Sequence, residues 1–136
     1  MPIPMDSPPL AEVIRVADFR ASLRAFLRDT ERIAAHHGLT PQRYLLLLMI
    51  KGAPDGSERS TVTELTSRLQ IAQHTVTELV ARAEKAGLVR REASAIDRRV
   101  VHIRLTEKGE RLLTKSFGDL AADRRMLREL VARLEP

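Results

Sequence analysis

The sequence contains no cysteine and no apolar run long enough to cross a membrane. Without cysteine the chain can form neither a disulfide framework nor a thiol switch. A transmembrane helix needs about 18 or more consecutive apolar residues, and a secretory signal needs a basic segment followed by an apolar one. The sequence shows neither pattern, so we expect the protein to stay in the cytoplasm.

Sequence motifs of enzymes are also missing. The four histidines, His36, His37, His74 and His102, show no i, i+4 or HExxH spacing, and there is no P-loop or nucleotide-binding glycine pattern. Zinc motifs also draw on cysteine, so none can be assembled here. We therefore predict no catalytic residue, no metal site and no cofactor, and we interpret His36 and His37 as helix-end residues. A metal or nucleotide retained by the purified protein would support the enzyme alternative.

Length and charge indicate one domain with an anionic partner. At 136 residues the chain is large enough for a hydrophobic core but not for a separate catalytic domain, so residues 1–136 are treated as one domain. It carries 23 basic and 18 acidic side chains. Its isoelectric point near 10.4 exceeds the value of about 9 above which nucleic-acid binding is suspected. The net charge of +5 would double in a dimer.

Residues 61–87 predict two short helices. Apolar residues recur at intervals of three and four in both segments, which gives each helix one apolar stripe. These residues are Val62, Leu65 and Leu69 in the first segment, and Val76, Leu79, Val80 and Ala83 in the second. Thr61 and Glu64 form a capping box at the start of the first helix, and Gly87 suits a left-handed cap after the second. This succession is typical of a helix-turn-helix.

The second helix of the pair is the candidate for the DNA major groove. If its apolar stripe faces the core, polar side chains near its N-terminus face outward and can reach base edges. These side chains are Gln73, His74, Thr75, Thr77, Glu78 and Arg82. Ala72 stands where a Ser or Thr cap is expected, so the helix begins at Gln73 or Thr75. The alternative interpretation is an ordinary solvated helix face.

The chain after the second helix predicts a β-hairpin, because the period of its apolar residues changes from 3.6 to 2. One strand places its alternate side chains, Val101, Ile103 and Leu105, on a single face. Residues 93–98 are the expected tip, and residues 88–92 pair back to complete the hairpin. A hairpin that follows a helix-turn-helix forms the wing of a DNA-reading module.

The predicted hairpin carries five arginines against two acidic residues, a local net charge of +3. The arginines are Arg90, Arg91, Arg98, Arg99 and Arg104. An arginine at a hairpin tip gains most from a narrow minor groove, where the negative potential of DNA is concentrated. Asp97 and Arg99 can pair and hold the tip in shape. The alternative is an exposed ion pair of little energetic value.

Several short motifs occur in the order typical of a known family. They are Gly38-Leu39-Thr40 followed by Tyr44, Leu46 and Leu47, the V-x-E-L-x-x-R-L helix, Glu84-Lys85-x-Gly87-Leu88-Val89, the D-x-R tip, and Leu105-Thr106-x-x-Gly109. On these residues the chain resembles the MarR (multiple antibiotic resistance regulator) family of winged-helix proteins. The resemblance implies a homodimeric DNA-binding regulator. Members of this family are usually repressors, and many of them are released from DNA when they bind phenolic or lipophilic ligands. It also implies that Arg99 acts at the wing tip with Asp97 as its partner, and that Gln73 to Thr77 begins the recognition helix.

The segments that flank the winged part predict dimerisation helices. A helix over residues 10–37 opens with prolines and carries much apolar surface, and residues 107–135 contain a heptad seam from Leu113 to Leu134. The seam could alternatively pack on the chain's own core. The winged part covers residues 41–106, and its first helix, YLLLLMIKG, is so apolar all round that we expect it to be buried. Residues 52–60 have the composition of a loop.

Four residues are candidates for an effector pocket: Arg20 and His37 of the first helix, with Arg43 and Tyr44 of the next. An effector can release DNA only by favouring a dimer with wrongly spaced recognition helices, which places the pocket where the dimer helices join the winged part. Cationic and hydrogen-bonding tips beside leucines would suit an aromatic carboxylate, although Tyr44 could serve packing alone. A ladder of like charges along the first helix is either a solvated face or part of an anion pocket. It consists of Arg20, Arg24, Arg28 and Arg32.

The expected fold class is mainly α with a small β-hairpin: a winged helix-turn-helix with N- and C-terminal dimerisation helices. The expected function is sequence-specific binding of a pseudo-palindromic double-stranded DNA operator by a homodimeric repressor, which a small aromatic or lipophilic effector releases. No membrane partner is expected. The alternative is a winged helix that binds a protein or acts as a sequence-indifferent DNA architectural factor. Polar groups on the recognition helix argue against that alternative, because base contacts are needed only to read sequence.

Overall fold

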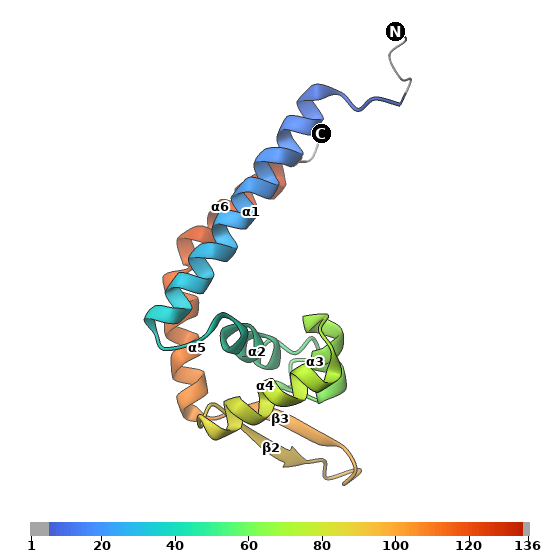
Figure 1. The fold of residues 1–136 in the computed structure, drawn as a ribbon, viewed down its shortest axis with the longest axis vertical. Coiled ribbons are helices and arrows are strands. Elements are labelled where there is room, and N and C mark those ends of the chain that lie inside the picture. Colours follow the sequence, from blue (N-terminus) through green and yellow to red (C-terminus); the bar gives the residue numbers. More distant parts are fainter. Residues whose placement is uncertain (1–5, 135–136) are drawn as a thin grey trace.

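The structure is a computed structural model that describes residues 6–134. Six helices and three strands follow one another along this described part of the chain. They are α1 (Leu10–His36), α2 (Pro41–Lys51), β1 (Arg59–Ser60), α3 (Val62–Leu69), α4 (Gln73–Lys85), β2 (Val89–Ala93), β3 (Val101–Leu105), α5 (Glu107–Asp119) and α6 (Ala121–Leu134). The helices α1 and α6 lie side by side as an arm that projects from the winged body, which α2 to β3 form; α5 connects the two parts (Figure 1).

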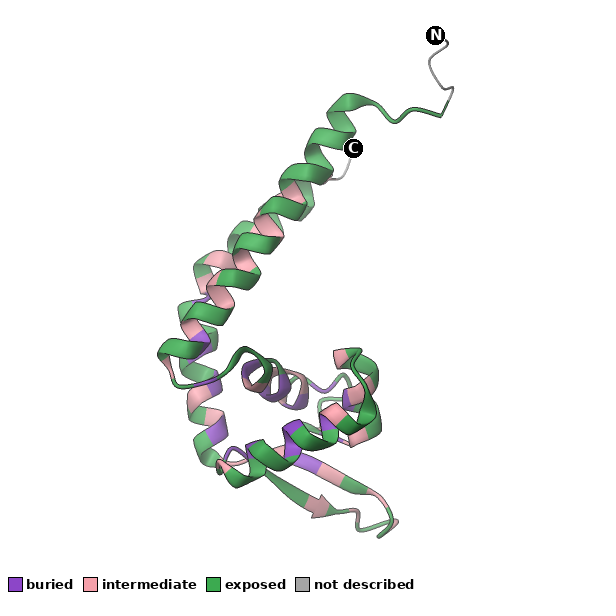
Figure 2. Cartoon of the chain, viewed as in Figure 1, coloured by how far each residue is buried: buried purple, intermediate pink, exposed green. Residues whose placement is uncertain are grey.

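The winged body has one hydrophobic core, to which α2, α3, α4 and β3 all contribute (Figure 2). Leu47 of α2, Leu65 of α3, Val80 of α4 and Ile103 of β3 have no exposed surface. The apolar stripe predicted for α4 is confirmed, since all four of its members are buried. Burying one such side chain fully is worth about 1.5–3 kcal/mol, so these contacts fix α4 firmly on the body.

The ends of α3 and α4 show the capping that the sequence predicts. The Thr61 hydroxyl accepts a hydrogen bond from the Glu64 amide at 3.1 Å, and the Glu64 carboxylate accepts one from the Thr61 amide at 3.1 Å. After α4, Gly87 adopts a left-handed φ of +77°, and the Leu88 amide donates to the Ala83 carbonyl at 2.9 Å. This is the Schellman arrangement, which ends a helix sharply and sends the chain into β2.

The wing belongs to a three-stranded antiparallel sheet with the strand order β1-β3-β2. The strands β2 and β3 pair from Val89 with Leu105 to Ala93 with Val101, which confirms the predicted hairpin. Its loop, residues 94–100, is called the wing tip below. The sequence predicts only a loop over residues 52–60, but β1 within it pairs with β3. A two-residue strand is too short to show the alternation from which strands are predicted.

The helices α2, α5 and α6 can be compared with the burial and the heptad seam that the sequence predicts for them. The predicted heptad seam is continuous only if one helix spans it. The helix is interrupted at Leu120, between α5 and α6. Arg124 bridges the break: its guanidinium donates to the Phe117 carbonyl at 2.6 Å and lies 3.6 Å from the centre of the Phe117 ring. The expectation that α2 is buried is confirmed for most of its apolar run: Tyr44, Leu46, Leu47 and Ile50 are buried, and Leu48 and Met49 pack against the core. Leu45 is the exception, at 41% exposed.

The arm buries little of its own surface. Ala34 is the one buried residue of α1, and the described part of α6 has none. Several large apolar side chains of the arm face solvent, so Figure 2 shows both helices largely as exposed. They are Leu10, Val13, Ile14, Val16, Leu27, Met126 and Val131. The arm therefore presents an apolar surface that the protomer does not cover.

Candidate nucleic-acid interface

The outer face of α4 carries the polar residues expected to contact bases. Thr75 is half-buried and the others are exposed, namely Gln73, His74, Thr77, Glu78 and Arg82. The Thr77 hydroxyl donates to the Gln73 carbonyl at 3.0 Å, so only its lone pairs remain for a donor on DNA. The other polar side chains of this face project from α4, and the apolar side of α4 is buried in the core and holds the helix in place.

The start of α4 is open to an external acceptor. The helix begins at Gln73, the first of the two starting points expected, and Ala72 before it supplies no side-chain cap. The first amides of a helix have no partner within the helix, and the positive end of its dipole faces the same way. Such an end favours phosphate, which suits a helix that enters a DNA groove beside the backbone.

The wing tip is held in shape by local hydrogen bonds. The Ser94 hydroxyl accepts from the amides of Ile96 and Asp97, at 3.2 and 3.3 Å, and the Val100 amide donates to the Asp97 carbonyl at 2.9 Å. The Asp97 carboxylate accepts from the Arg99 amide at 3.0 Å and from its guanidinium at 3.1 and 3.2 Å. The predicted pairing of Asp97 with Arg99 is therefore confirmed.

The same contact sets the ionisation of Asp97. Hydrogen bonds from the Arg99 side chain, and then from its backbone amide, lower the pKa of the Asp97 carboxyl below its ordinary value. The carboxylate therefore stays charged at neutral pH and keeps hold of Arg99. The Arg99 side chain is nevertheless 91% exposed, so its guanidinium is oriented by the protein and open to a ligand.

Most wing arginines are already paired within the protein. The contacts are Arg90 with the Glu92 carboxylate at 3.0 Å, Arg91 with the Glu84 carboxylate at 3.3 Å, and Arg104 with the Ser57 carbonyl at 3.0 Å. Within residues 6–134, no carboxylate lies at ion-pairing distance from Arg98. Among the described residues Arg98 is thus exposed and free of an ion pair, and Arg99 stays 91% exposed although Asp97 holds it, so these two arginines of the tip are the ones most open to DNA.

The predicted site omits two residues that shape it. Ser94 orders the tip through its hydroxyl, and a serine shortly before an aspartate in a loop is a turn signal that could have revealed it. The second is Ser57, whose carbonyl accepts from Arg104 and ties the wing to the chain before β1. Ser57 and Arg104 are 47 positions apart, so no local pattern connects them.

The four effector candidates do not meet within the protomer. A helix rises about 1.5 Å per residue, so Arg20, near the middle of α1, and His37, directly after its end, lie about 25 Å apart. His37 contacts the Asp119 carboxylate at 2.8 Å, Arg43 is half-buried, and Tyr44 is only 4% exposed. One protomer therefore does not bring the four candidates into a single pocket, because the length of α1 separates Arg20 from His37.

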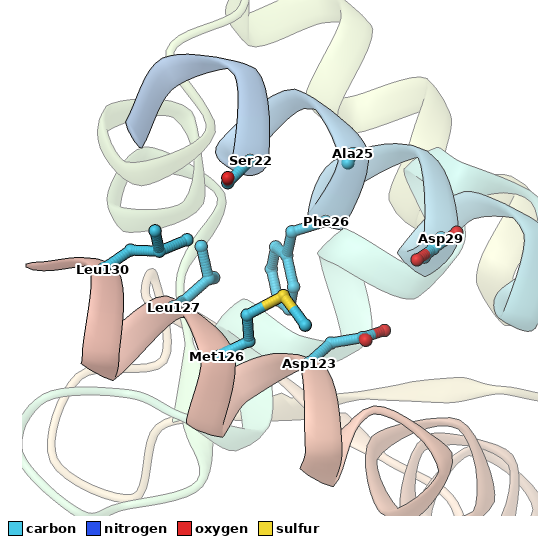
Figure 3. Close-up of a pocket in the computed structure, with 8 residues that line it drawn as sticks. All are labelled: Ser22, Ala25, Phe26, Asp29, Asp123, Met126, Leu127 and Leu130. Carbon is cyan, nitrogen blue, oxygen red and sulfur yellow. The ribbon is translucent and has the colours of Figure 1, made fainter. Parts of the chain in front are cut away.

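One hollow lies within the arm, and another lies where the body meets α5. One, of about 140 Å³, lies between α1 and α6, where the Phe26 and Met126 side chains extend into the space between the helices (Figure 3). The other, of about 470 Å³, lies between α2 and α5. Its lining includes apolar Leu48, Leu113 and Phe117, together with Lys51 and Glu110. This second hollow touches both the body and the helix that leads to the arm.

Residues 6–134 contain neither a membrane-spanning helix nor a cluster of metal ligands. No helix among residues 6–134 is both long and apolar enough to span a bilayer. The same residues contain no group of three histidine, aspartate or glutamate side chains placed to hold a metal ion. The histidines are distributed over separate places: His36 and His37 at the end of α1, His74 on α4 and His102 on β3.

A helix-turn-helix formed by α3 and α4, followed by a hairpin with arginines at its tip, defines a winged helix, a class of DNA-reading domain. The profile of the MarR family matches residues 37–100 of the chain. The chain belongs to the MarR family of DNA-binding transcriptional regulators. Its members are regulators of transcription and not enzymes.

Individual relatives agree with this assignment. TtmR, an HTH-type transcriptional regulator of Methylorubrum extorquens (strain PA1), is 40% identical over 95 residues, which are 70% of this chain and 47% of TtmR. The matched part thus spans about half the length of that relative. YsmB, an uncharacterized HTH-type transcriptional regulator of Bacillus subtilis (strain 168), is 34% identical over 80% of this chain and 73% of its own. A MarR family protein from Bacillus stearothermophilus has a similar structure, with a TM-score of 0.71, 27% identity, and 92% and 83% of the two chains covered.

Proposed function

We propose that this MarR-family chain is a homodimeric, sequence-specific repressor whose release from its operator is controlled by a small effector. The observation that carries the proposal is the contrast between two surfaces. The winged body presents the polar face of α4 and the arginines of the wing tip, whereas the arm presents uncovered apolar side chains. The first surface suits DNA, and the second suits another copy of the chain.

On DNA, α4 lies in the major groove and the wing tip in the adjacent minor groove. Gln73, His74 and Arg82 then face base edges, where a good paired contact is worth about 1–3 kcal/mol of discrimination. Arg98 and Arg99 lie in or beside the minor groove and neutralise phosphate charge there. The first group selects the sequence, and the second contributes affinity for any duplex.

The arm pairs with the arm of a second copy. A 27-residue helix with one buried residue has gained little from folding, so α1 requires a partner surface. A second copy offers the same apolar side chains of α1 and α6, and two-fold symmetry lets each arm cover the other. Two α4 helices about one DNA turn apart then read a pseudo-palindrome, with half-sites about 10 base pairs apart.

The effector site is the hollow between α2 and α5. The Lys51 ammonium lies there, 2.9 Å from Glu110 and 3.0 Å from Glu58. The hydrogen bonds that it donates to these carboxylates, first to Glu110 and then to Glu58, raise the pKa of Lys51. A neutral aromatic effector fits this hollow better than an anionic one: its ring can contact Leu48 and Phe117, and a hydroxyl on it can donate to the Glu110 carboxylate. Because α2 belongs to the body and α5 leads to the arm, a bound ligand can alter the spacing of the two recognition helices.

The test compares variants of the two DNA-contacting groups. Arg99→Ala should weaken binding to every duplex and reduce the salt slope by about one unit for each phosphate that is no longer neutralised. His74→Ala should instead change base preference, by about 1–3 kcal/mol at each base that the imidazole reads. Arg125→Ala, on an exposed arginine of α6, is the matched control and should bind like the parent.

Two outcomes would overturn the proposal. A folded Arg99→Ala protein that binds as tightly as the parent at every salt concentration would remove the wing from the interface. Equal affinity of the parent for unrelated duplexes would favour the sequence-indifferent architectural alternative, because a reader of base edges loses about 1–3 kcal/mol for each wrong base pair.

A further inference from the structure

The wing tip carries a large apolar side chain that has no part in the core. Ile96 is 99% exposed, and the next most exposed large apolar residue of the described chain, Leu10, is 72% exposed. An isoleucine exposed to water does not contribute the stabilising free energy that its burial would give. Because isoleucine is branched at Cβ, it populates few rotamers. Ile96 is therefore a stiff apolar projection at the end of the wing.

The backbone around Ile96 is ordered by the hydrogen bonds that shape the tip. The Ile96 amide and the amide after it both donate to the Ser94 hydroxyl, at 3.2 and 3.3 Å. The bond from the Val100 amide to the Asp97 carbonyl, at 2.9 Å, closes the turn on the other side. Ile96 thus has a defined position in the same short turn as the two arginines that are open to DNA.

We propose that Ile96 is a DNA-contacting residue, which enters the minor groove beside Arg98 and Arg99 and packs against the deoxyribose rings that form the groove walls. The inference rests on the proposed DNA-binding function and adds an apolar contact to it. The minor groove is about 6 Å wide, and its walls present sugar C–H groups to whatever enters. Proteins that bind this groove commonly combine cationic side chains with apolar ones.

An apolar contact and a phosphate contact respond differently to salt. Neutralising a phosphate releases bound counterions, so each such contact adds to the slope of affinity against salt concentration. Removing an isoleucine from water releases no ions. Replacing Ile96 should therefore lower affinity by the same factor at all salt concentrations, whereas replacing Arg98 should lower it most at low salt.

The experiment measures binding of the full chain to a duplex that the parent protein selects from a random-sequence pool. Ile96→Ala should weaken binding about fivefold to tenfold with the salt slope unchanged, which corresponds to burial of about half an isoleucine side chain. Ile96→Val should stay within about twofold of the parent, and Ile96→Thr, of the same shape as valine but polar, should bind about threefold more weakly than Ile96→Val. Arg98→Ala should reduce the salt slope by about one unit.

A second measurement places the contact in the minor groove. Guanine adds an amino group to that groove, and inosine removes it while keeping the major-groove pattern of guanine. With the base pair beneath the wing changed to G·C or I·C, the parent should prefer I·C by about fivefold or more. Ile96→Ala should lose most of this preference, because the amino group projects from the groove floor into the space between the walls, and alanine needs less of that space than isoleucine.

The outcomes separate this inference from the function on which it rests. If Arg99→Ala weakens binding but Ile96→Ala binds like the parent, the DNA-binding function stands and the role of Ile96 is refuted. A salt slope reduced in Ile96→Ala as much as in Arg98→Ala would also refute it, since the isoleucine would then act only by positioning arginines. Ile96 is almost fully exposed, so the unfolding midpoint of Ile96→Ala should equal that of the parent and exclude a folding defect.

Discussion

The winged body and the arm are both rich in apolar residues, but they bury them to very different extents. In the body, residues from four elements have no exposed surface, among them Leu47, Leu65 and Ile103. In the arm, Ala34 is the one buried residue of α1, and the described part of α6 has none. The contrast indicates that the body is stable through its own contacts and that the arm is completed by the proposed second copy.

The largest effect expected within one protomer comes from the core of the body. Ile103→Ala, at a residue with no exposed surface, should reduce the free energy of unfolding by about 2–5 kcal/mol. Ile96→Ala makes the same chemical change in the same hairpin at a residue that is 99% exposed, so it should leave that free energy unchanged. Urea unfolding of both variants measures the difference. Equal losses would mean that burial in the body does not determine its stability.

A smaller effect is expected where α5 meets the body. A Cβ at Gly109 would collide with the Leu88 carbonyl oxygen, so Gly109→Ala must push α5 from the turn after α4 and should cost about 1–3 kcal/mol. Gly118, on the same helix, has nothing within 4 Å of such a Cβ, and Gly118→Ala should stabilise the helix by up to about 1 kcal/mol. Thermal unfolding of the pair gives the comparison. A Gly109→Ala protein as stable as the parent would contradict the close packing of α5.

The smallest effect concerns Tyr44, the only tyrosine of the chain. Burial raises the pKa of its phenol, and the charge of Arg124 at the base of the arm lowers it in part. Absorbance titration of the folded protein should therefore give a midpoint above the ordinary value of about 10, and Arg124→Met should raise it further. Between the unfolded and folded pKa values the unfolded state loses its proton first, so stability should fall as pH rises there. A midpoint at the ordinary value would show that Tyr44 is solvated.

The features that the sequence predicts well are those that depend on residues close together in the chain. The stripe of α4, the Thr61–Glu64 box and the alternation of β3 each lie within a few residues, and all three are present in the structure. The features that it does not predict join distant positions. The pairing of β1 with β3 and the hydrogen bond from Arg104 to Ser57 connect segments more than 40 residues apart. The spacing of apolar residues along the sequence does not indicate such contacts.

The candidate DNA site shows the same division. Asp97 and Arg99 are two residues apart, and their pairing follows from that spacing. Counting arginines along the wing could not show that Arg91 is held by Glu84 of α4, because that ion pair depends on how the hairpin packs. The four effector candidates are not brought together within one protomer for a related reason: Arg20 lies on α1 and His37 directly after its end, and the length of helix between them separates the two.

The most direct test of the contrast between body and arm is a DNA-binding measurement on a protein whose arm cannot pair. Met126 and Val131 are 59% and 49% exposed in the protomer, so Met126→Glu with Val131→Glu should spare the body and disrupt only contacts with a second copy. Met126→Leu keeps an apolar side chain of similar volume and is the control. Each protein is sedimented and then titrated with a selected palindrome and with one half of it.

We expect the parent and the control to sediment as two chains and to prefer the palindrome over its half by about 100-fold or more, since the second binding event is then intramolecular. The doubly charged variant should remain folded, sediment as one chain and bind the two duplexes equally. A variant that still sediments as two chains, that keeps the preference for the palindrome, or whose winged body unfolds would contradict the division of the molecule into a self-sufficient body and a shared arm.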